Sequence, residues 1–235
     1  MTAESREIEF KFAVDGHEAF ERLLRQLELP ASLMNSGVTQ TNHFFDSTAL
    51  CLRQHHFVIR LREAGGTYAL TLKGERSNGT SRSGALSSRI EEEVLIPHAA
   101  AEALMKGDLP PQQAIRDHFS DRASTLGNMI DSACEGQKLV HIGRFINERI
   151  HLPPVDLPVG KASETLVFEL DTSTFPGNRV EHEIEVEIRA HSDAAGIETA
   201  LIELLQEARI EWRTAPSKAV RFFAALENTS DELMD

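Results

Sequence analysis

The chain has 235 residues, of which 41% are hydrophobic and 26% charged, as is typical of a soluble globular protein long enough to bury a substantial core. Its net charge of −13 argues against broad affinity for nucleic acid or for an anionic membrane surface. No apolar run approaches the ~20 residues of a membrane span, and the first residues do not resemble a signal peptide. We therefore expect a cytoplasmic protein that binds neither membranes nor nucleic acid.

The two cysteines, Cys51 and Cys134, lack the spacing of metal ligands. Without evidence of export, the sequence predicts reduced thiols rather than a disulfide.

Hydrophobic periodicity predicts a β-rich chain with helices at intervals. Residues 6–14 alternate as a strand does, and apolar residues at helical spacing predict a helix over residues 15–29, with Asp15 as its N-cap. Further strands are predicted, in chain order, at residues 38–46, 56–63, 67–74 and 88–97.

The second half of the chain is predicted from the same signals. A Gly- and Ser-rich loop covers residues 75–88, and a helical middle covers residues 99–134 with a break at "GDLPP". Strands at 138–152, 164–175 and 179–190 precede helices at 193–208 and 217–226. With no linker and no repeat, we expect one domain over residues 1–235.

Charged side chains share one face of the opening strand, because side chains alternate with period two. Glu7, Glu9 and Lys11 lie on that face, opposite Ile8 and Phe10. The same segregation recurs in five other strands. It groups Arg60 with Arg62, Lys73 with Thr71, Arg89 with Glu91 and Glu93, Glu169 with Asp171, and Glu183 with Glu185 and Glu187.

A single strand of this kind is better interpreted as having a solvated outer face. The whole set is harder to explain in that way, because three glutamates on one face repel each other unless something neutralises them. Hard oxygen ligands suit Mg²⁺ or Mn²⁺, and paired arginines suit phosphate oxygens. The pattern therefore indicates a site for a metal–polyphosphate complex.

Acidic and basic strands can face one another only if their sheet closes on itself. We therefore predict an α+β fold with a closed antiparallel β-barrel, a charged interior and an apolar exterior covered by helices. Cationic walls would bind phosphates, and anionic walls the metals that bridge them.

Nine short motifs resemble those of the CYTH superfamily, also called triphosphate tunnel metalloenzymes. In chain order they are "EIEFK", "NHFFDS", "RLR", "LTLKG", "RIEEE", "NERIHL", "FELD", "HEIEVE" and "APSKAVRFF". One motif alone would be weak, but nine in order across residues 4–226 are specific. The resemblance implies a charged tunnel of about eight antiparallel strands, a C-terminal plug helix, and chemistry on a triphosphate with Mg²⁺ or Mn²⁺.

The resemblance also implies roles for individual residues. The implied metal ligands are Glu7, Glu9, Glu91, Glu93, Glu169, Asp171, Glu183 and Glu185. For Glu91 and Glu93 the resemblance also allows a role in holding basic partners in place, and Glu169 and Asp171 are similarly placed. The implied phosphate contacts are Lys11, Arg60, Arg62, Lys73, Arg89, Arg149, Lys218 and Arg221, of which Lys11, Arg60, Arg62, Lys73 and Lys218 would be catalytic. Glu92 departs from the pattern, because it places a charge on the predicted apolar face of its strand.

The sequence thus predicts divalent-metal-dependent hydrolysis of a small-molecule triphosphate by a monomer or homodimer. Inorganic tripolyphosphate, cleaved to pyrophosphate and phosphate, is the preferred substrate. Thiamine triphosphatase, class IV adenylyl cyclase-type and nucleoside triphosphatase activities remain open within the same fold. Two hypotheses do not involve catalysis. One is a noncatalytic polyphosphate- or nucleotide-binding module, and the other is a purely structural barrel.

Overall fold

The computed structural model describes residues 5–77, 83–119, 125–189 and 192–232. Its strands are β1 (Ser5–Val14), β2 (Val38–Ser47), β3 (Val58–Ala64), β4 (Thr67–Ser77), β5 (Leu86–Ile96), β6 (Leu139–His151), β7 (Val155–Val159), β8 (Ala162–Phe175), β9 (Arg179–Glu187) and β10 (Trp212–Thr214). Its α-helices are α1 (His17–Gln26), α2 (Cys51–Gln54), α3 (His98–Lys106), α4 (Pro111–His118), α5 (Thr125–Ala133), α6 (Ala194–Glu207) and α7 (Lys218–Glu232), and the 3₁₀ helices are η1 (Ala31–Asn35) and η2 (Pro176–Asn178).

The hydrogen-bonded order of the strands closes the sheet. The order is β10-β1-β5-β4-β3-β2-β6-β8-β7, and β9 pairs with both β1 and β8. Eight strands therefore form a ring that β9 closes. Strand β9 pairs antiparallel with both of its neighbours, β1 and β8. The predicted closed antiparallel barrel is confirmed. Strands β7 and β10 lie outside the ring and were not predicted.

Two compact units make up the chain, and each is built from separate stretches of sequence. The first contains mainly Gln40–Arg76 and Arg89–Ile146, and the second contains Glu7–Thr39, Ser77–Ser88 and Asn147–Asp235. The chain passes between the units several times. The prediction of a single domain stays a prediction.

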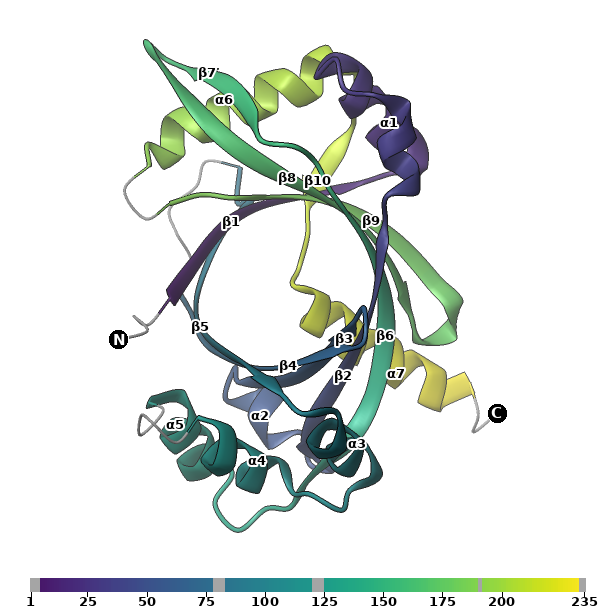
Figure 1. Cartoon of the computed structure of the whole chain (residues 1–235), viewed down its shortest axis with the longest axis vertical. Helices are drawn as coiled ribbons and strands as arrows, with labels where there is room; N and C mark the ends of the chain where they lie inside the picture. The colour runs from purple at the N-terminus through teal and green to yellow at the C-terminus, as the bar shows by residue number, and fades with distance from the viewer. Residues whose placement is uncertain (1–4, 78–82, 120–124, 190–191, 233–235) are drawn as a thin grey trace. The chain divides into compact units, whose positions relative to one another are not determined.

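In the first unit, the apolar side chains of the strands pack beneath helices. Ile59 and Leu61 of β3 and Leu70 and Leu72 of β4 are fully buried in a cluster that includes side chains of α3, α4 and α5. Figure 1 shows these three helices together, in teal, beside the strands. Because side chains alternate along a strand, Arg60 lies on the opposite face from its neighbours Ile59 and Leu61.

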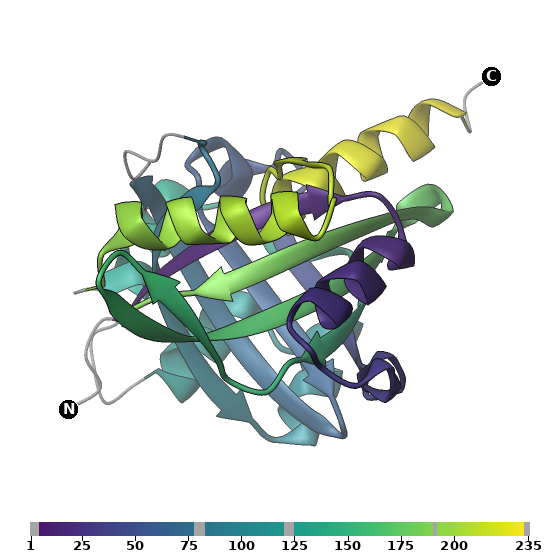
Figure 2. The same ribbon diagram turned by 90° about the horizontal axis from the view of Figure 1, so that it is seen from above.

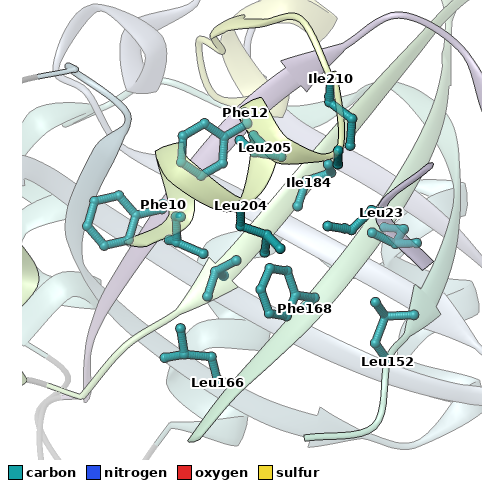
Figure 3. Close-up of a cluster of buried hydrophobic side chains, with 14 of the residues drawn as sticks. Phe10, Phe12, Leu23, Leu152, Leu166, Phe168, Ile184, Leu204, Leu205 and Ile210 are labelled. Carbon is teal, nitrogen blue, oxygen red and sulfur yellow. The ribbon is translucent and has the colours of Figure 1, made fainter. Parts of the chain in front are cut away.

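The second unit repeats this arrangement with α6. Phe10 and Phe12 of β1, together with Phe168 of β8, pack against Leu204 and Leu205 of α6 (Figure 3). Figure 2 shows α6 running across the strands on this face. All five side chains are at most 6% exposed, so the face of β1 that was predicted to be apolar is buried beneath a helix. The charged face of β1 is therefore turned away from α6.

Helices α1 and α6 are capped differently at their N-termini. The side chain of Asp193 accepts a hydrogen bond from the backbone N–H of Gly196, 3.0 Å away, and caps α6 as its position before the helix suggests. Asp15 does not cap α1, because Gly16 occupies the N-cap position with φ of 73°. The Asp15 carboxylate instead accepts from Arg213, 2.9 Å away. The Asp15 prediction was wrong by one residue.

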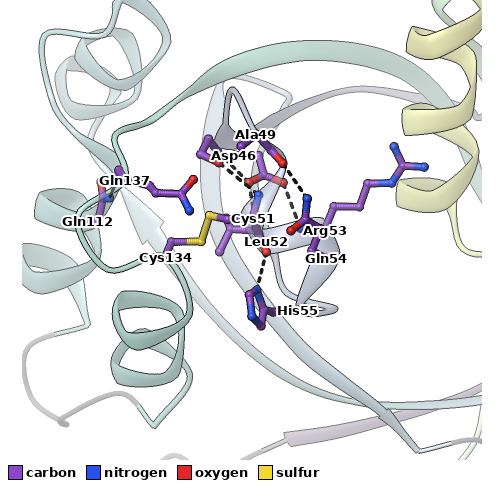
Figure 4. The surroundings of a disulfide bond; sticks show 11 residues. Asp46, Ala49, Cys51, Leu52, Arg53, Gln54, His55, Gln112, Cys134 and Gln137 are labelled. Atoms are coloured by element: carbon purple, nitrogen blue, oxygen red, sulfur yellow. Dashed lines mark hydrogen bonds between the residues drawn. A yellow bond between two sulfur atoms is a disulfide. The ribbon is translucent and has the colours of Figure 1, made fainter.

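A disulfide joins Cys51, at the start of α2, to Cys134, just after α5 (Figure 4). Both cysteines are 3% exposed and belong to the buried cluster of the first unit. The prediction of reduced thiols was wrong, because the fold brings together two residues that are 83 positions apart in sequence.

Asp46 lies next to the disulfide but is already bonded. Its carboxylate accepts from the backbone N–H groups of Ser47, Leu52 and Arg53 at 2.7–3.0 Å, which anchors α2. Asp46 and the two cysteines are close enough together to suggest a metal site. The disulfide and these three hydrogen bonds use the same groups, so we assign them a structural role.

Removing the disulfide is expected to lower the free energy of unfolding of the protein by roughly 2–4 kcal/mol, because the cross-link closes a long loop in the unfolded chain. The variant is Cys51→Ser with Cys134→Ser, and the measurement is urea unfolding of variant and wild type without reductant. Adding reductant should shift the wild type towards the variant and leave the variant unchanged. Equal midpoints for the two proteins without reductant would contradict the cross-link.

Among the described residues, no helix combines the length and the apolar character that crossing a membrane requires.

Candidate functional site

Charged residues of β1, β6, β8, β9 and α7 form one network in the second unit, here called the carboxylate cluster. Its members are Glu9, Lys11, Arg149, Glu169, Asp171, Glu183, Glu185, Lys218 and Arg221. Strand register creates the network, because residues paired across an antiparallel ladder lie on the same face. Lys11 of β1 is opposite Glu185 of β9, and Glu185 is opposite Glu169 of β8.

Lys11 is held among carboxylates. Its ammonium forms a short ion pair with Glu185, lies 2.8 Å from Glu9 Oε1 and 3.9 Å from Glu183 Oε1, and its side chain is 9% exposed. Burial alone would lower the pKa of Lys11, but the nearby carboxylates, Glu7 included, hold this pKa well above its usual value. Lys11 is therefore a permanent cation.

Glu185 is the carboxylate that the cations share. It accepts from Lys11 and, at 2.7 Å, from Lys218 through Oε1, and from Arg149 through Oε2 at 2.6 Å. Burial alone would raise the pKa of Glu185, but these three cations hold the pKa well below its usual range. The side chain predicted to lie on the last charged strand thus gathers cations from β1, β6 and α7.

Lys218 is the first residue of α7, so the start of this helix reaches the cluster. Its ammonium lies 2.7 Å from an oxygen of Asp171 and 2.7 Å from Glu185. Burial alone would lower the pKa of Lys218, and Asp171, Glu183 and Glu185 together raise this pKa above its usual value. The part of the prediction that calls α7 a plug stays a prediction.

The two carboxylate oxygens of Glu183 differ in their contacts, and Oε2 forms a short ion pair with Arg221. Within the described part of the chain its buried Oε1 accepts no hydrogen bond, and the nearest ammonium nitrogens, of Lys218 and Lys11, lie 3.7 Å and 3.9 Å away. Burial raises the pKa of Glu183 above its usual value, and the charge of Glu185 adds to the shift. A hard divalent cation would supply the missing positive charge, so these residues fit the metal that the sequence pattern implies.

Arg221 lies one helical turn after Lys218 on α7. Its guanidinium bonds Glu181 at 2.7 Å and forms a short pair with Glu183. It also lies over the ring of Phe175, 5.5 Å from the centroid. These contacts occupy Arg221 in holding α7 against β8 and β9.

A second group of charged residues lies in the first unit and is here called the β3–β5 cluster. Lys73 Nζ is 2.6 Å from Glu91 Oε2, and an Nη of Arg60 is 3.5 Å from Glu91 Oε1 and 3.7 Å from Glu93. Thr71 joins it, because its hydroxyl donates to Glu93 at 2.8 Å. The lysine, arginine and glutamates predicted on three separate strands thus contact one another.

Glu92 lies on the other face of β5 and has a partner there. Its Oε1 accepts from the backbone N–H of Leu126, 3.2 Å away, in the first turn of α5. A carboxylate at a helix N-terminus is stabilised by the unpaired N–H groups and by the helix dipole. The Glu92 charge that departed from the sequence pattern therefore anchors a helix, while Glu91 and Glu93 contact the β3–β5 cluster.

The remaining predicted residues are placed by their strands. Arg62 shares a face of β3 with Arg60 and pairs in register with Asn42. Arg89 is half-buried on β5, on the face of Glu91. Glu7 begins the described side chains of β1 and acts on Lys11 through its charge.

The sequence analysis named Thr71, but it missed three other polar residues that contact the carboxylate cluster. Asn147 and Ser173 are each 1% exposed; Ser173 donates a hydrogen bond to Asn147, and Asn147 donates one to Asp171. Glu181 bonds Arg221. Their alternation with Arg149, Asp171 and Glu183 was the available signal, because each lies two residues from one of them on the same face of a strand.

The fold and the two clusters define a closed antiparallel β-barrel protein with apolar, helix-covered strand faces and ionic side chains on the opposite faces. The chain belongs to the CYTH family, because the family model described as the CYTH domain matches residues 5–223.

Similar proteins agree with this assignment. The chain is 27% identical over 143 residues to a Bacillus subtilis (strain 168) protein named "Putative triphosphatase YjbK", covering 60% of this chain and 72% of that one. The solved structure of HpAC1 from Hippeastrum has a TM-score of 0.70 at 22% identity and covers 93% of this chain and 95% of its own. It is described as a "putative adenylyl cyclase" with a dominant triphosphatase activity. A Bacillus halodurans structure described as a "putative adenylate cyclase" has a TM-score of 0.59 at 22% identity, covering 93% of this chain and 98% of its own.

Proposed function

We propose that this protein hydrolyses a triphosphate with the help of a divalent metal ion, and that inorganic tripolyphosphate is its preferred substrate. The observation that carries the proposal is the convergence of three cations, the buried Lys11 and the partly buried Arg149 and Lys218, on a cluster that also contains Glu183, whose Oε1 accepts no hydrogen bond from the described residues. Such a cluster offers donors to phosphate oxygens and a ligand to a metal within a few ångströms. The activities named for YjbK and HpAC1 support the same reaction.

The roles of the residues follow from their charges. Glu9 and Glu183, with Glu185 beside them, would hold Mg²⁺ or Mn²⁺, which when bound neutralises charge on the phosphate oxygens. Lys11, Arg149 and Lys218 bind phosphate oxygens in exchange for part of their present carboxylate contacts. We also assign Arg60, Arg62, Lys73 and Arg89 of the first unit as phosphate contacts.

Hydrolysis needs water placed in line with the terminal phosphorus. The water oxygen forms a bond to that phosphorus as the bond to the bridging oxygen breaks, which releases phosphate and leaves pyrophosphate. The fixed cations stabilise the charge that spreads over the transferred group, and carboxylates of the cluster orient the water. Positioning and charge neutralisation supply the catalysis, and no covalent intermediate on the protein is required.

Phosphate release from tripolyphosphate, ATP and thiamine triphosphate, each with Mg²⁺ or Mn²⁺, tests the proposal. We expect tripolyphosphate to be hydrolysed fastest and EDTA to stop the reaction. Faster turnover of ATP or of thiamine triphosphate would overturn the substrate order, and cyclic AMP formed from ATP would indicate a cyclase. Binding of tripolyphosphate without any turnover would favour the noncatalytic module.

A further inference from the structure

Asp171 is a carboxylate of the carboxylate cluster whose acceptor positions are all in use. It is fully buried. Its Oδ1 accepts from Asn147 Nδ2 at 2.8 Å and from Arg149 Nε at 2.7 Å. Its Oδ2 accepts from a second nitrogen of Arg149 and lies 2.7 Å from Lys218 Nζ. Because a carboxylate has about four lone-pair positions, four donors leave none for a metal ion.

Arg149 meets Asp171 through one complete edge of its guanidinium. Nε and Nη2 bond the two carboxylate oxygens side by side, which is the bidentate geometry that fixes the plane of an arginine. The other terminal nitrogen points to Glu169, whose side chain is 24% exposed. The Nε–Nη2 edge is thus committed to Asp171, and the Nη1 side is the part that can turn to a phosphate.

A second layer holds Asp171 in place. Ser173 Oγ donates to Asn147 Oδ1 at 2.7 Å, and the amide of Asn147 donates in turn to Asp171. The Ser173–Asn147–Asp171 chain runs from β8 to β6 and back to β8, with all three side chains at most 1% exposed. A buried polar chain whose members all have partners is rigid, because each bond fixes the orientation of the next group.

Glu183 differs from Asp171 in its hydrogen bonding. Glu183 is as deeply buried as Asp171, but its Oε1 accepts no hydrogen bond from the described residues. The two carboxylates are opposite each other in the register of β8 and β9. One has spare coordination capacity and the other has none.

We propose that Asp171 is a positioning residue that orients Arg149 and Lys218 towards the substrate, with Asn147 and Ser173 as its supports, and that it does not ligate the metal. This role differs from the metal-ligand role that the family resemblance implies for Asp171, and it rests on the proposed triphosphatase function. It divides the acidic residues into metal ligands such as Glu183 and holders of cations such as Asp171.

One binding and one kinetic measurement on the whole protein separate a metal-ligand role from a positioning role. Mn²⁺ binding without substrate is followed by electron paramagnetic resonance, and the KM and kcat for tripolyphosphate are measured at saturating Mg²⁺. Asp171→Asn should keep Mn²⁺ affinity within about twofold of wild type and raise KM by roughly 10- to 100-fold, the range expected for losing charge-assisted hydrogen bonds. Glu183→Gln, the matched variant from the opposite register position, should lose Mn²⁺ affinity by roughly tenfold or more.

Ser173→Ala keeps the test informative if Asp171→Asn fails to fold. It leaves every charge in place and should raise KM by roughly fivefold without changing Mn²⁺ affinity, with Ser173→Thr restoring the wild-type KM. Loss of Mn²⁺ affinity in Asp171→Asn to the extent seen in Glu183→Gln would overturn the inference alone, as would a wild-type KM in Ser173→Ala. A wild-type protein that neither binds nor hydrolyses tripolyphosphate would overturn the proposed function itself.

Discussion

Glu183→Gln is expected to lower kcat for tripolyphosphate hydrolysis by roughly 10³-fold, because it removes the carboxylate with spare coordination capacity at the centre of the cluster. Glutamine has nearly the same shape and cannot neutralise a divalent cation. The measurement is steady-state phosphate release over a range of Mg²⁺ concentrations.

The same carboxylate also makes stability depend on pH. The pKa of Glu183 is raised in the folded state, so the folded protein binds a proton there more tightly than the unfolded chain does. Stability from this group is therefore greatest at low pH and falls as the pH rises from its unfolded pKa through its folded pKa. Glutamine does not titrate, so the Glu183→Gln variant should lose this part of the pH dependence, which urea unfolding of both proteins across this pH range measures.

Glu187→Gln is the matched control, because Glu187 lies on the same face of β9 and is exposed. We expect its activity to stay within about twofold of wild type, as exposed substitutions usually have small effects. A Glu183→Gln protein with wild-type activity would show that Glu183 has another role.

Lys218→Gln is expected to lower kcat/KM for tripolyphosphate by roughly 10²- to 10³-fold, because a fixed cation that would contact phosphate oxygens is lost. It should also cost about 3–5 kcal/mol of unfolding free energy, since Asp171 and Glu185 lose a buried partner. Steady-state kinetics and urea unfolding at neutral pH measure the two effects on one preparation.

Lys218→Arg separates the two effects. It keeps the charge next to Asp171 and Glu185 and should recover most of the stability, but its planar head changes the donor geometry and should leave kcat/KM roughly tenfold low. Lys161→Gln, in the exposed turn between β7 and β8, is the surface control and should match the wild type in both measurements. Full activity of Lys218→Gln would remove Lys218 from the site.

The separation of charged and apolar faces could be predicted from the sequence because it is local. Alternation along a strand assigns Phe10 and Lys11 to opposite faces whatever the strand's neighbours are. The structure buries Phe10 under α6 and places Lys11 among carboxylates. Closure of the sheet followed from the need to bring opposite charges together, and the pairing of β9 with β1 and β8 provides it.

What the sequence did not show depends on contacts between distant segments. Strand β7 contains Pro158 and pairs with β8 at the end of the strand order. A proline weakens the sequence signal of a strand even where an edge strand tolerates it. Asn147 and Ser173 are uncharged, so a search for charge patterns passed over them. The disulfide was not predicted, because a cytoplasmic protein is expected to have reduced thiols and the sequence does not show that Cys51 and Cys134 lie together in the fold.

A crystal structure of the protein with tripolyphosphate and Mn²⁺ tests most directly whether the charged strand faces form a triphosphate site. We predict phosphate oxygens in contact with Lys11, Arg149 and Lys218, and anomalous scattering from manganese next to Glu183. An anion bound elsewhere, with the pairs of Glu185 to Lys11, Arg149 and Lys218 all intact, would contradict this assignment.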